Sequence, residues 1–369
     1  MRLEVSIRRE LSSFPLSLDL ASDARRIGVL GASGAGKSML LKCIAGVERP
    51  DAGSIRLDGR TLFDAAHRVN LPPQRRQVGY LFQSYALFPT MSVEENIGAG
   101  VRGRSRAERG ALVARMVRRF ELSGLEGSFP AQLSGGQKQR VALARLLAAG
   151  PRLILLDEPF SALDEYLRDR MQEELLELLE EFEGSVVMVS HSRDEVFRLC
   201  EEVHVLDVGR LVRGGPTAEV FDDPRTKAAA TLTGCKNFSR ACRLDAHRLQ
   251  ALDWGITIVA ERRSVPEGLC HVGYRAHQFR PVWGPRQENC LRLRLVARTQ
   301  LQFERNYYLL PELEAPARDQ RITWLVQRSG WSDLDARGLP DYLRFDEDDL
   351  LLLKGSHSPG PRDQRSRRF

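Results

Sequence analysis

Hydrophobic and polar positions are spaced differently along the chain, and each pattern predicts a different kind of element. The segments 3–7, 15–20 and 54–59 alternate apolar and polar residues with a period of two. Such alternation is typical of half-buried antiparallel strands. Residues 153–156 and 185–189 are instead almost uninterrupted apolar runs. They are expected to be strands buried on both faces of a parallel sheet.

Helical patterns lie between these apolar runs. The run at 26–30 passes through a glycine-rich loop into a helix-like segment that should stop at Gly46, and a second helical pattern covers residues 166–183. This alternation of strands and helices predicts an α/β fold with an open parallel sheet. The polar, largely helical stretch at about 86–147 is expected to form a helical subdomain.

The composition changes after Gly234, where short β-like runs are separated by Gly and Pro turns. Residues 1–234 carry 32 basic and 32 acidic side chains, whereas residues 235–369 carry 23 and 17, so the net charge of +6 lies in the second part. We expect a first domain at 1–234, a small β domain at 235–354, and a disordered basic tail at 355–369.

Length and composition limit the class of protein further. A chain of 369 residues with 42% hydrophobic and 28% charged residues is globular and should hold two or three domains. Neither a membrane span nor a signal peptide is expected, and six scattered cysteines predict reduced thiols in the cytosol. A modest basic excess without zinc-finger spacing or a basic aromatic face gives no reason to expect nucleic acid.

The strongest chemical signal is a glycine-rich loop of the form G-x-x-x-x-G-K-S. Backbone N–H groups of such a loop cradle phosphate oxygens, the lysine reaches the β and γ phosphates, and the serine hydroxyl can ligate Mg²⁺. A chance match is the alternative, but the strand before and the helix after the loop disfavour it. The expected nucleotide contacts are Gly31, Ala32, Ser33, Gly34, Ala35, Gly36, Lys37 and Ser38.

A second signal is the pair Asp157 and Glu158, which follows an apolar strand. The strand should deliver Asp157 to the carboxyl edge of the sheet, where it can hold Mg²⁺, and Glu158 is a candidate general base for an attacking water. A solvated acidic turn is the alternative. The division of roles between the two acids is less well defined than their joint presence.

A third signal is Ser134-Gly135-Gly136-Gln137 at the start of a helical pattern. Free N–H groups and the positive end of the helix dipole would favour an anion there. Taken alone, such a segment is more often only a turn and a helix cap.

These motifs and three shorter ones together resemble the ATP-binding cassette (ABC) transporter ATPases. The resemblance covers residues 1 to about 222, with the motifs in the family's order and spacing. They correspond to the family's Walker A loop at Gly31–Ser38, the Q-loop glutamine Gln83, the LSGGQ signature at 133–137, the Walker B strand at 153–158, the D-loop at 161–164 and the switch histidine His191.

The resemblance implies a P-loop cassette fold with an antiparallel β subdomain and a helical subdomain, using ATP and Mg²⁺. It implies that Glu158 orients water, His191 contacts the γ-phosphate, and Gln83 links the metal site to the helical subdomain. The metal would be held by Ser38, Gln83 and Asp157. Two copies would form a head-to-tail homodimer in which Ser134 and Gly136 of one subunit close on the γ-phosphate held by Lys37 of the other. Asp164 of the D-loop would also contact the nucleotide.

The resemblance extends to an importer. The segment 85–97 is similar to the docking segment for an integral membrane permease, which would place the chain at the cytoplasmic face of the membrane, with an extracytoplasmic substrate-binding protein as an indirect partner. The short N-terminal hairpin and the GASGAGKS loop look most similar to molybdate importer ATPases. Importers of sulfate, ferric iron, polyamines or sugars remain alternatives, and a soluble ABC ATPase without a transport role is a further one.

Two features depart from the family pattern or stay open. Residues 1–13 contain no aromatic side chain for stacking on adenine, so that Phe14 or Arg8 becomes the candidate. In the second part, Lys236, Arg275 or His277 could form an oxyanion or regulatory site, with an ordinary β-domain surface as the more common alternative.

Overall fold

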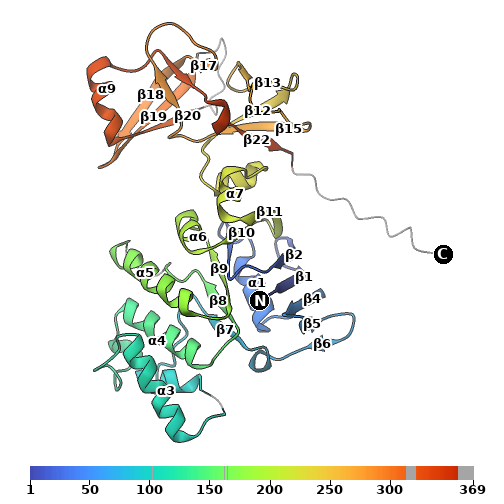
Figure 1. Cartoon of the computed structure of the whole chain (residues 1–369), viewed down its shortest axis with the longest axis vertical. Helices are drawn as coiled ribbons and strands as arrows, with labels where there is room; N and C mark the ends of the chain where they lie inside the picture. The colour runs from blue at the N-terminus through green and yellow to red at the C-terminus, as the bar shows by residue number, and fades with distance from the viewer. Residues whose placement is uncertain (102, 162, 164, 313–320, 356–369) are drawn as a thin grey trace, which may run out of the picture. The chain divides into compact units, whose positions relative to one another are not determined.

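The chain divides into two compact units, each with its own sheets and core (Figure 1). The units are Met1–Ala218 and Glu219–Phe369. The predicted boundary at residue 234 falls inside the second unit, because helix α8 (Lys227–Leu232) packs on strands of that unit. The computed structural model describes residues 1–101, 103–161, 163, 165–312 and 321–355, so the predicted tail lies outside the described residues except for Gly355.

The first unit is built on a mixed sheet whose centre is parallel. Side by side lie β10 (Glu202–Asp207), β3 (Arg26–Gly31), β9 (Ser185–Ser190), β8 (Leu153–Asp157) and β7 (Val78–Leu81). Every residue of β8 and β9 is buried, as their apolar sequences predict for strands covered on both faces. The predicted open parallel sheet is therefore confirmed.

An antiparallel layer continues the same sheet. Strand β1 (Leu3–Glu10) pairs with β2 (Pro15–Ser22) on one side and with β4 (Ala52–Leu57) on the other. In β1 alternate residues from Leu3 to Ile7 are buried, which is the pattern that period-two alternation predicts. Strands β5 (Arg60–Asp64) and β6 (Val69–Asn70) extend this edge, and β11 (Arg210–Pro216) joins β2 to β10.

A helical subdomain begins inside the predicted segment at about 86–147 and ends one residue beyond it. Its helices are α2 (Val93–Ala99), α3 (Arg106–Arg119) and α4 (Gly135–Ala148), which contact one another. Figure 1 labels α3 and α4. Each begins with a serine whose hydroxyl accepts a hydrogen bond from the third helical residue, while the Glu or Gln side chain of that residue bonds back to the serine N–H. This reciprocal capping fixes where each helix starts.

The other helices of the first unit flank the parallel strands. They are α1 (Lys37–Ala45), α5 (Glu165–Glu181) and α6 (Arg193–Leu199), with α7 (Thr217–Asp222) at the division between the units. Helix α1 ends as predicted at Gly46, whose φ of 79° suits a residue without a side chain. None of the helices in the described part of the chain combines the length and apolar character needed to cross a membrane.

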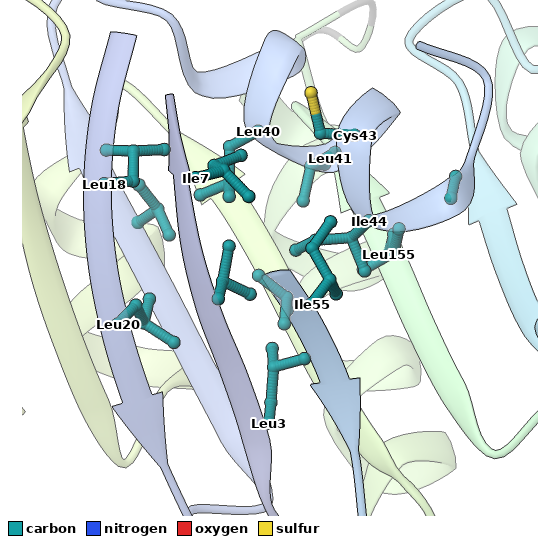
Figure 2. Packing of buried hydrophobic residues seen from close by; sticks show 14 of the residues in the cluster. Leu3, Ile7, Leu18, Leu20, Leu40, Leu41, Cys43, Ile44, Ile55 and Leu155 are labelled. Carbon is teal, nitrogen blue, oxygen red and sulfur yellow. The ribbon is translucent and has the colours of Figure 1, made fainter. Parts of the chain in front are cut away.

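The core of the first unit forms where α1 covers the sheet. Figure 2 shows Leu40, Leu41 and Ile44 of α1 together with Ile7, Ile55 and Leu155, which come from both the antiparallel and the parallel strands. Each of these side chains is at most 2% exposed. Burial of this apolar area therefore fixes α1, and with it the loop that precedes α1, against the sheet.

A buried arginine closes the C-terminal end of α1. The Arg76 side chain is fully buried and its guanidinium donates to the carbonyl oxygens of Cys43 and Ile44 at 2.8 and 2.9 Å. It also donates to the Leu71 carbonyl and to Asn70 Oδ1. A cation at the negative end of a helix dipole, with its donors satisfied, offsets the penalty of burying the charge.

The second unit is β-rich, as predicted from its short strands and turns. Its sheets have the orders β14-β13-β12-β15-β22, β16-β21-β17 and β18-β19-β20, with antiparallel pairing. Its remaining helix is α9 (Trp331–Arg337). The strands are β12 (Asn237–Arg243), β13 (Arg248–Ala251), β14 (Ile256–Val259), β15 (Leu269–Tyr274), β16 (Arg280–Val282), β17 (Cys290–Leu291), β18 (Leu293–Gln300), β19 (Glu304–Pro311), β20 (Ile322–Gln327), β21 (Tyr342–Arg344) and β22 (Leu351–Lys354).

An aromatic cluster fills the centre of the second unit. The ring of Phe345 stacks on Trp254 at 5.1 Å and meets Tyr274 edge-on at 5.0 Å, with Phe279 against both Tyr274 and Phe345. All four side chains are buried. Such rings bury large areas, so this unit has a core of its own.

Replacing Arg76 with Met should lower the free energy of unfolding of the first unit by about 1 to 3 kcal/mol, because buried carbonyl oxygens at the end of α1 lose their donors. The measurement is urea unfolding followed by far-ultraviolet circular dichroism. Tryptophan fluorescence is unsuitable, since all four tryptophans lie in the second unit. Arg56→Met on the exposed side of β4 is the matched control, and an equal loss in both variants would contradict the role of Arg76.

Candidate functional site

The candidate site lies where the parallel strands end. In the sheet Leu30 of β3 is level with Ser190 of β9, and Asp157 of β8 is level with Val189. Because the strands run parallel, the residues that follow their carboxyl ends meet at one edge. This edge collects the glycine-rich loop, the Asp157–Glu158 pair and His191 from three distant parts of the sequence.

The glycine-rich loop turns tightly from β3 into α1. A side chain at Gly31 would place its first carbon 2.6 Å from the carbonyl oxygen of Leu206, so only glycine allows β10 to approach. The ammonium of Lys37 is 4% exposed and donates to the carbonyl oxygens of Gly31 and Ala32 at 2.9 and 3.0 Å. The loop thus folds around the lysine that was predicted to reach phosphate.

The first acid of the pair is held by two hydroxyl groups. Asp157 is 6% exposed, and its Oδ1 accepts a hydrogen bond of 2.8 Å from the Ser38 hydroxyl. Its Oδ2 accepts one of the same length from the Tyr80 phenol. The structure therefore brings together Ser38 and Asp157, two of the three residues predicted to hold the metal.

The second acid lies between two nitrogen-bearing side chains. The Oε1 atom of Glu158 is 3.5 Å from the Lys37 ammonium, and its Oε2 atom is 3.2 Å from Nδ1 of His191. The backbone of Glu158 has a φ of 45°, which is unfavourable for a residue with a side chain. Its N–H donates to the Val189 carbonyl at 3.0 Å, which anchors this strained turn to β9.

The predicted Q-loop residue contacts the segment after the acids. Nε2 of Gln83 donates to the Ser161 hydroxyl at 3.2 Å, and this hydroxyl donates to the Glu158 carbonyl at 2.9 Å. Gln83 is thus connected to the acidic turn through Ser161, with an exposed side chain that leaves room for movement. Asp164, the other predicted residue of this segment, lies outside the described residues.

The Ser134–Gln137 segment caps α4. The Ser134 hydroxyl accepts from the Gln137 N–H at 3.3 Å, and the Ser134 N–H donates to Oε1 of Gln137 at 2.9 Å. Among the described residues, no hydrogen bond or ion pair joins this segment to the glycine-rich loop of the same chain. The segment therefore forms the helix cap that its sequence predicts.

Two residues that contribute to the site were not identified from the sequence. Tyr80 is not among the site residues predicted from the sequence. Its place three residues before Gln83, on the strand next to the one that carries Asp157, is a signal that could have identified it. The turn that carries His191 is held by Glu195, which accepts from the Ser190 hydroxyl at 2.6 Å, while the Ser192 N–H donates to the same hydroxyl. Burial raises the pKa of Glu195.

The donor set at the edge suits a magnesium ion. A hydroxyl and a carboxylate lie within 2.8 Å of each other at Ser38 and Asp157, and Mg²⁺ is usually bound by one or two carboxylates together with water and phosphate oxygens. In the part of the chain that the structure describes, no cluster of three or more His, Cys, Asp or Glu residues could hold a metal. Oxygen donors such as the Ser38 hydroxyl and the Asp157 carboxylate fit Mg²⁺ better than a transition metal.

The remaining candidates are placed as follows. Phe14 is half-buried and lies beside Gly36 and Gly209, close to the glycine-rich loop. The Arg275 guanidinium donates to the Thr233 and Phe221 carbonyls and so ties segments of the second unit together. Lys236 is exposed, and His277 lies at the rim of a cavity of about 300 Å³ in that unit.

Comparison with known proteins agrees with this geometry. Residues 15–161 match the model of the ABC transporter family. The chain is 36% identical to the molybdenum import ATP-binding protein of Paramagnetospirillum magneticum over 272 residues, covering 72% of this chain and 74% of the relative. It is 40% identical to the Fe(3+) ions import ATP-binding protein of Streptomyces coelicolor over 344 residues, covering 90% of each.

A solved structure extends the match to the fold. The dimeric, post-hydrolysis ATP-binding cassette MJ0796, bound to ADP and phosphate, is 27% identical with a TM-score of 0.50, covering 59% of this chain and 99% of that chain. The similarity to these proteins and the residues gathered at the carboxyl edge of the sheet support the same conclusion. The chain belongs to the ABC transporter family and is one of its ATP-binding subunits, an ATPase.

Proposed function

We propose that this chain hydrolyses Mg²⁺-bound ATP to drive import of an oxyanion, molybdate, through a permease formed by other polypeptides. The observation that carries the hydrolytic part is the Glu158 carboxylate, held between the Lys37 ammonium and the His191 imidazole at 3.5 and 3.2 Å. A carboxylate in this position can accept a proton from water that attacks a phosphate lying against Lys37.

Each residue of the site has a distinct role in this proposal. Backbone N–H groups of the loop and Lys37 bind the phosphates, and Ser38 and Asp157 hold the metal, with Gln83 joining them when it leaves Ser161. Bound Mg²⁺ neutralises charge on the β and γ phosphates. Phosphate oxygens would compete with Glu158 for the Lys37 ammonium, so nucleotide binding would weaken that ion pair and free the carboxylate to contact water.

We further propose that two copies complete the site. The capped end of α4 presents Ser134 and Gly136 with the positive end of a 14-residue helix, a favourable place for an anion. Its lack of described contacts with the loop of its own chain favours a phosphate bound to a second copy. The dimeric structure of the similar cassette MJ0796 supports association of two copies.

The permease would dock on the segment 85–97. This segment begins with Tyr85 and Ala86, both with positive φ, whose carbonyl oxygens accept hydrogen bonds of 2.9 and 2.8 Å from Arg145 of α4. Phe88 is 44% exposed and available to a partner. Docking would place the chain peripherally at the cytoplasmic face of the membrane, and a substrate-binding protein would act through the permease.

The substrate is proposed from likeness. The short N-terminal hairpin and the GASGAGKS loop favour molybdate, as does the molybdenum-importing relative. A second candidate is ferric iron, because the relative aligned along most of both chains, second unit included, is an Fe(3+) importer subunit. Sulfate, polyamines and sugars remain less favoured, and a soluble ABC ATPase without a transport role is favoured least. The second unit is proposed to regulate transport.

Replacing Glu158 with Gln should lower ATP turnover by ~10² or more, because the shape is kept and the base is removed. ATP should still bind and hold the dimer closed. The measurement is steady-state phosphate release beside the gel-filtration mass with ATP. The matched control is Glu180→Gln on the exposed face of α5. Normal turnover in Glu158→Gln would place the base elsewhere.

Replacing Lys37 with Ala should weaken ATP binding about ten- to a hundredfold, the equivalent of a lost charge-assisted interaction of roughly 1.5 to 3 kcal/mol. Titration calorimetry measures the affinity. Lys42→Ala in the same helix is the control, because Lys42 lies toward the other end of α1. Equal affinities in the Lys37→Ala variant and the unchanged chain would exclude Lys37 as a phosphate ligand.

Cells that make this chain with its permease should accumulate radiolabelled molybdate, and cells with the Lys37→Ala chain should not. Unlabelled molybdate should compete with uptake, whereas equal concentrations of sulfate, putrescine or ferric citrate should not. If the cells take up labelled ferric iron in a way that depends on Lys37, and take up no molybdate, then ferric iron and not molybdate is the transported substrate.

A further inference from the structure

A tyrosine on the strand next to Asp157 completes the surroundings of that carboxylate. We propose that Tyr80 is a positioning residue: its phenol fixes the Asp157 side chain so that Oδ1 faces Ser38 and the metal, and thereby strengthens Mg²⁺-dependent binding of ATP. This inference rests on the proposed function of the site. The observation that supports it is the 2.8 Å hydrogen bond that the Tyr80 hydroxyl donates to Asp157 Oδ2.

The register of two strands sets the contact. Strand β7 pairs with β8 in parallel, with Tyr80 level with Leu155. Asp157 comes two residues after Leu155 on the same strand and so on the same face of the sheet. The length of the phenol spans the two-residue offset, so Tyr80 reaches the carboxylate from the neighbouring strand, while Ser38 reaches it from α1.

The chemistry of the two donors matters for a metal site. Both groups that bond to Asp157 in the described chain are neutral hydroxyls. They satisfy a carboxylate that is only 6% exposed without cancelling its negative charge, as an arginine or lysine would. The full charge therefore remains available to a cation.

The phenol is held in place by its surroundings. Burial and the neighbouring Asp157 carboxylate both raise the pKa of Tyr80 above its usual value. Its half-buried ring packs against the core of the first unit and lies 4.1 Å from the ring of Phe82. A ring held in this way can fix the orientation of the carboxylate it contacts.

The test replaces Tyr80 with Phe, which removes only the hydroxyl. ATP affinity is measured by titration calorimetry in full-length protein, once with Mg²⁺ and once with EDTA. We expect the affinity in EDTA to stay within about twofold and the affinity with Mg²⁺ to fall about three- to tenfold. This is the range of one ordinary hydrogen bond, because Tyr80 acts only through the orientation of Asp157. Tyr274→Phe is the matched control, because it removes a buried phenol in the second unit.

A double-mutant cycle tests whether Tyr80 acts through Asp157. In the Asp157→Asn chain, Tyr80→Phe should have no further effect on the response to Mg²⁺. Direct binding of Mn²⁺ with ATP, followed by electron paramagnetic resonance, gives a readout independent of turnover and should weaken in parallel in Tyr80→Phe.

Three outcomes would overturn the proposal: an equal fall in affinity with and without Mg²⁺, which indicates a packing role; no change in either condition; or additive effects of the two substitutions. Failure of the proposed function looks different, since the unchanged chain would then bind ATP weakly or show no response to Mg²⁺.

Discussion

The parallel register of β3, β8 and β9 is the constraint on which the site depends. These strands end at one edge, and the residues proposed to act on the nucleotide lie just past their ends: Lys37 after the loop that follows β3, Glu158 after β8 and His191 after β9. Complete burial of β8 and β9 makes the register costly to change, since a slip would force each side chain into close packing that is shaped for another residue. The contacts of Glu158 with Lys37 and His191 follow from this arrangement.

The adjacent acids Asp157 and Glu158 lie in different surroundings at this edge of the sheet. Asp157 contacts the neutral hydroxyls of Ser38 and Tyr80, which preserve its charge for a cation. Glu158 contacts an ammonium and an imidazole, partners that phosphate can draw away. The backbone at Glu158 is left-handed, with a φ of 45°, a conformation that is unfavourable for a residue with a side chain. Different environments for neighbouring carboxylates are a common basis for dividing the roles of ligand and base.

The sequence was sufficient for features that depend on local pattern. The buried strands, the loop at 31–38 and the cap at Ser134 and Gln137 were predictable because periodicity, glycine spacing and capping are encoded within a few residues. Contacts between distant segments were not predictable. The phenol of Tyr80 meets a carboxylate 77 residues away, and α8 joins the second unit although its sequence lies before the composition change at Gly234. Both depend on tertiary packing, which leaves no local pattern.

In the proposed head-to-tail dimer, one chain carries only part of a catalytic site. Among its described residues, no hydrogen bond or ion pair joins the glycine-rich loop to the capped end of α4. The most direct test is the rate of ATP hydrolysis per mole of chain over a wide range of protein concentration at saturating Mg²⁺ and ATP. A site completed by a second copy predicts that this specific activity rises with concentration until the dimer is saturated. A specific activity that stays constant down to concentrations where light scattering shows only monomer would contradict the account.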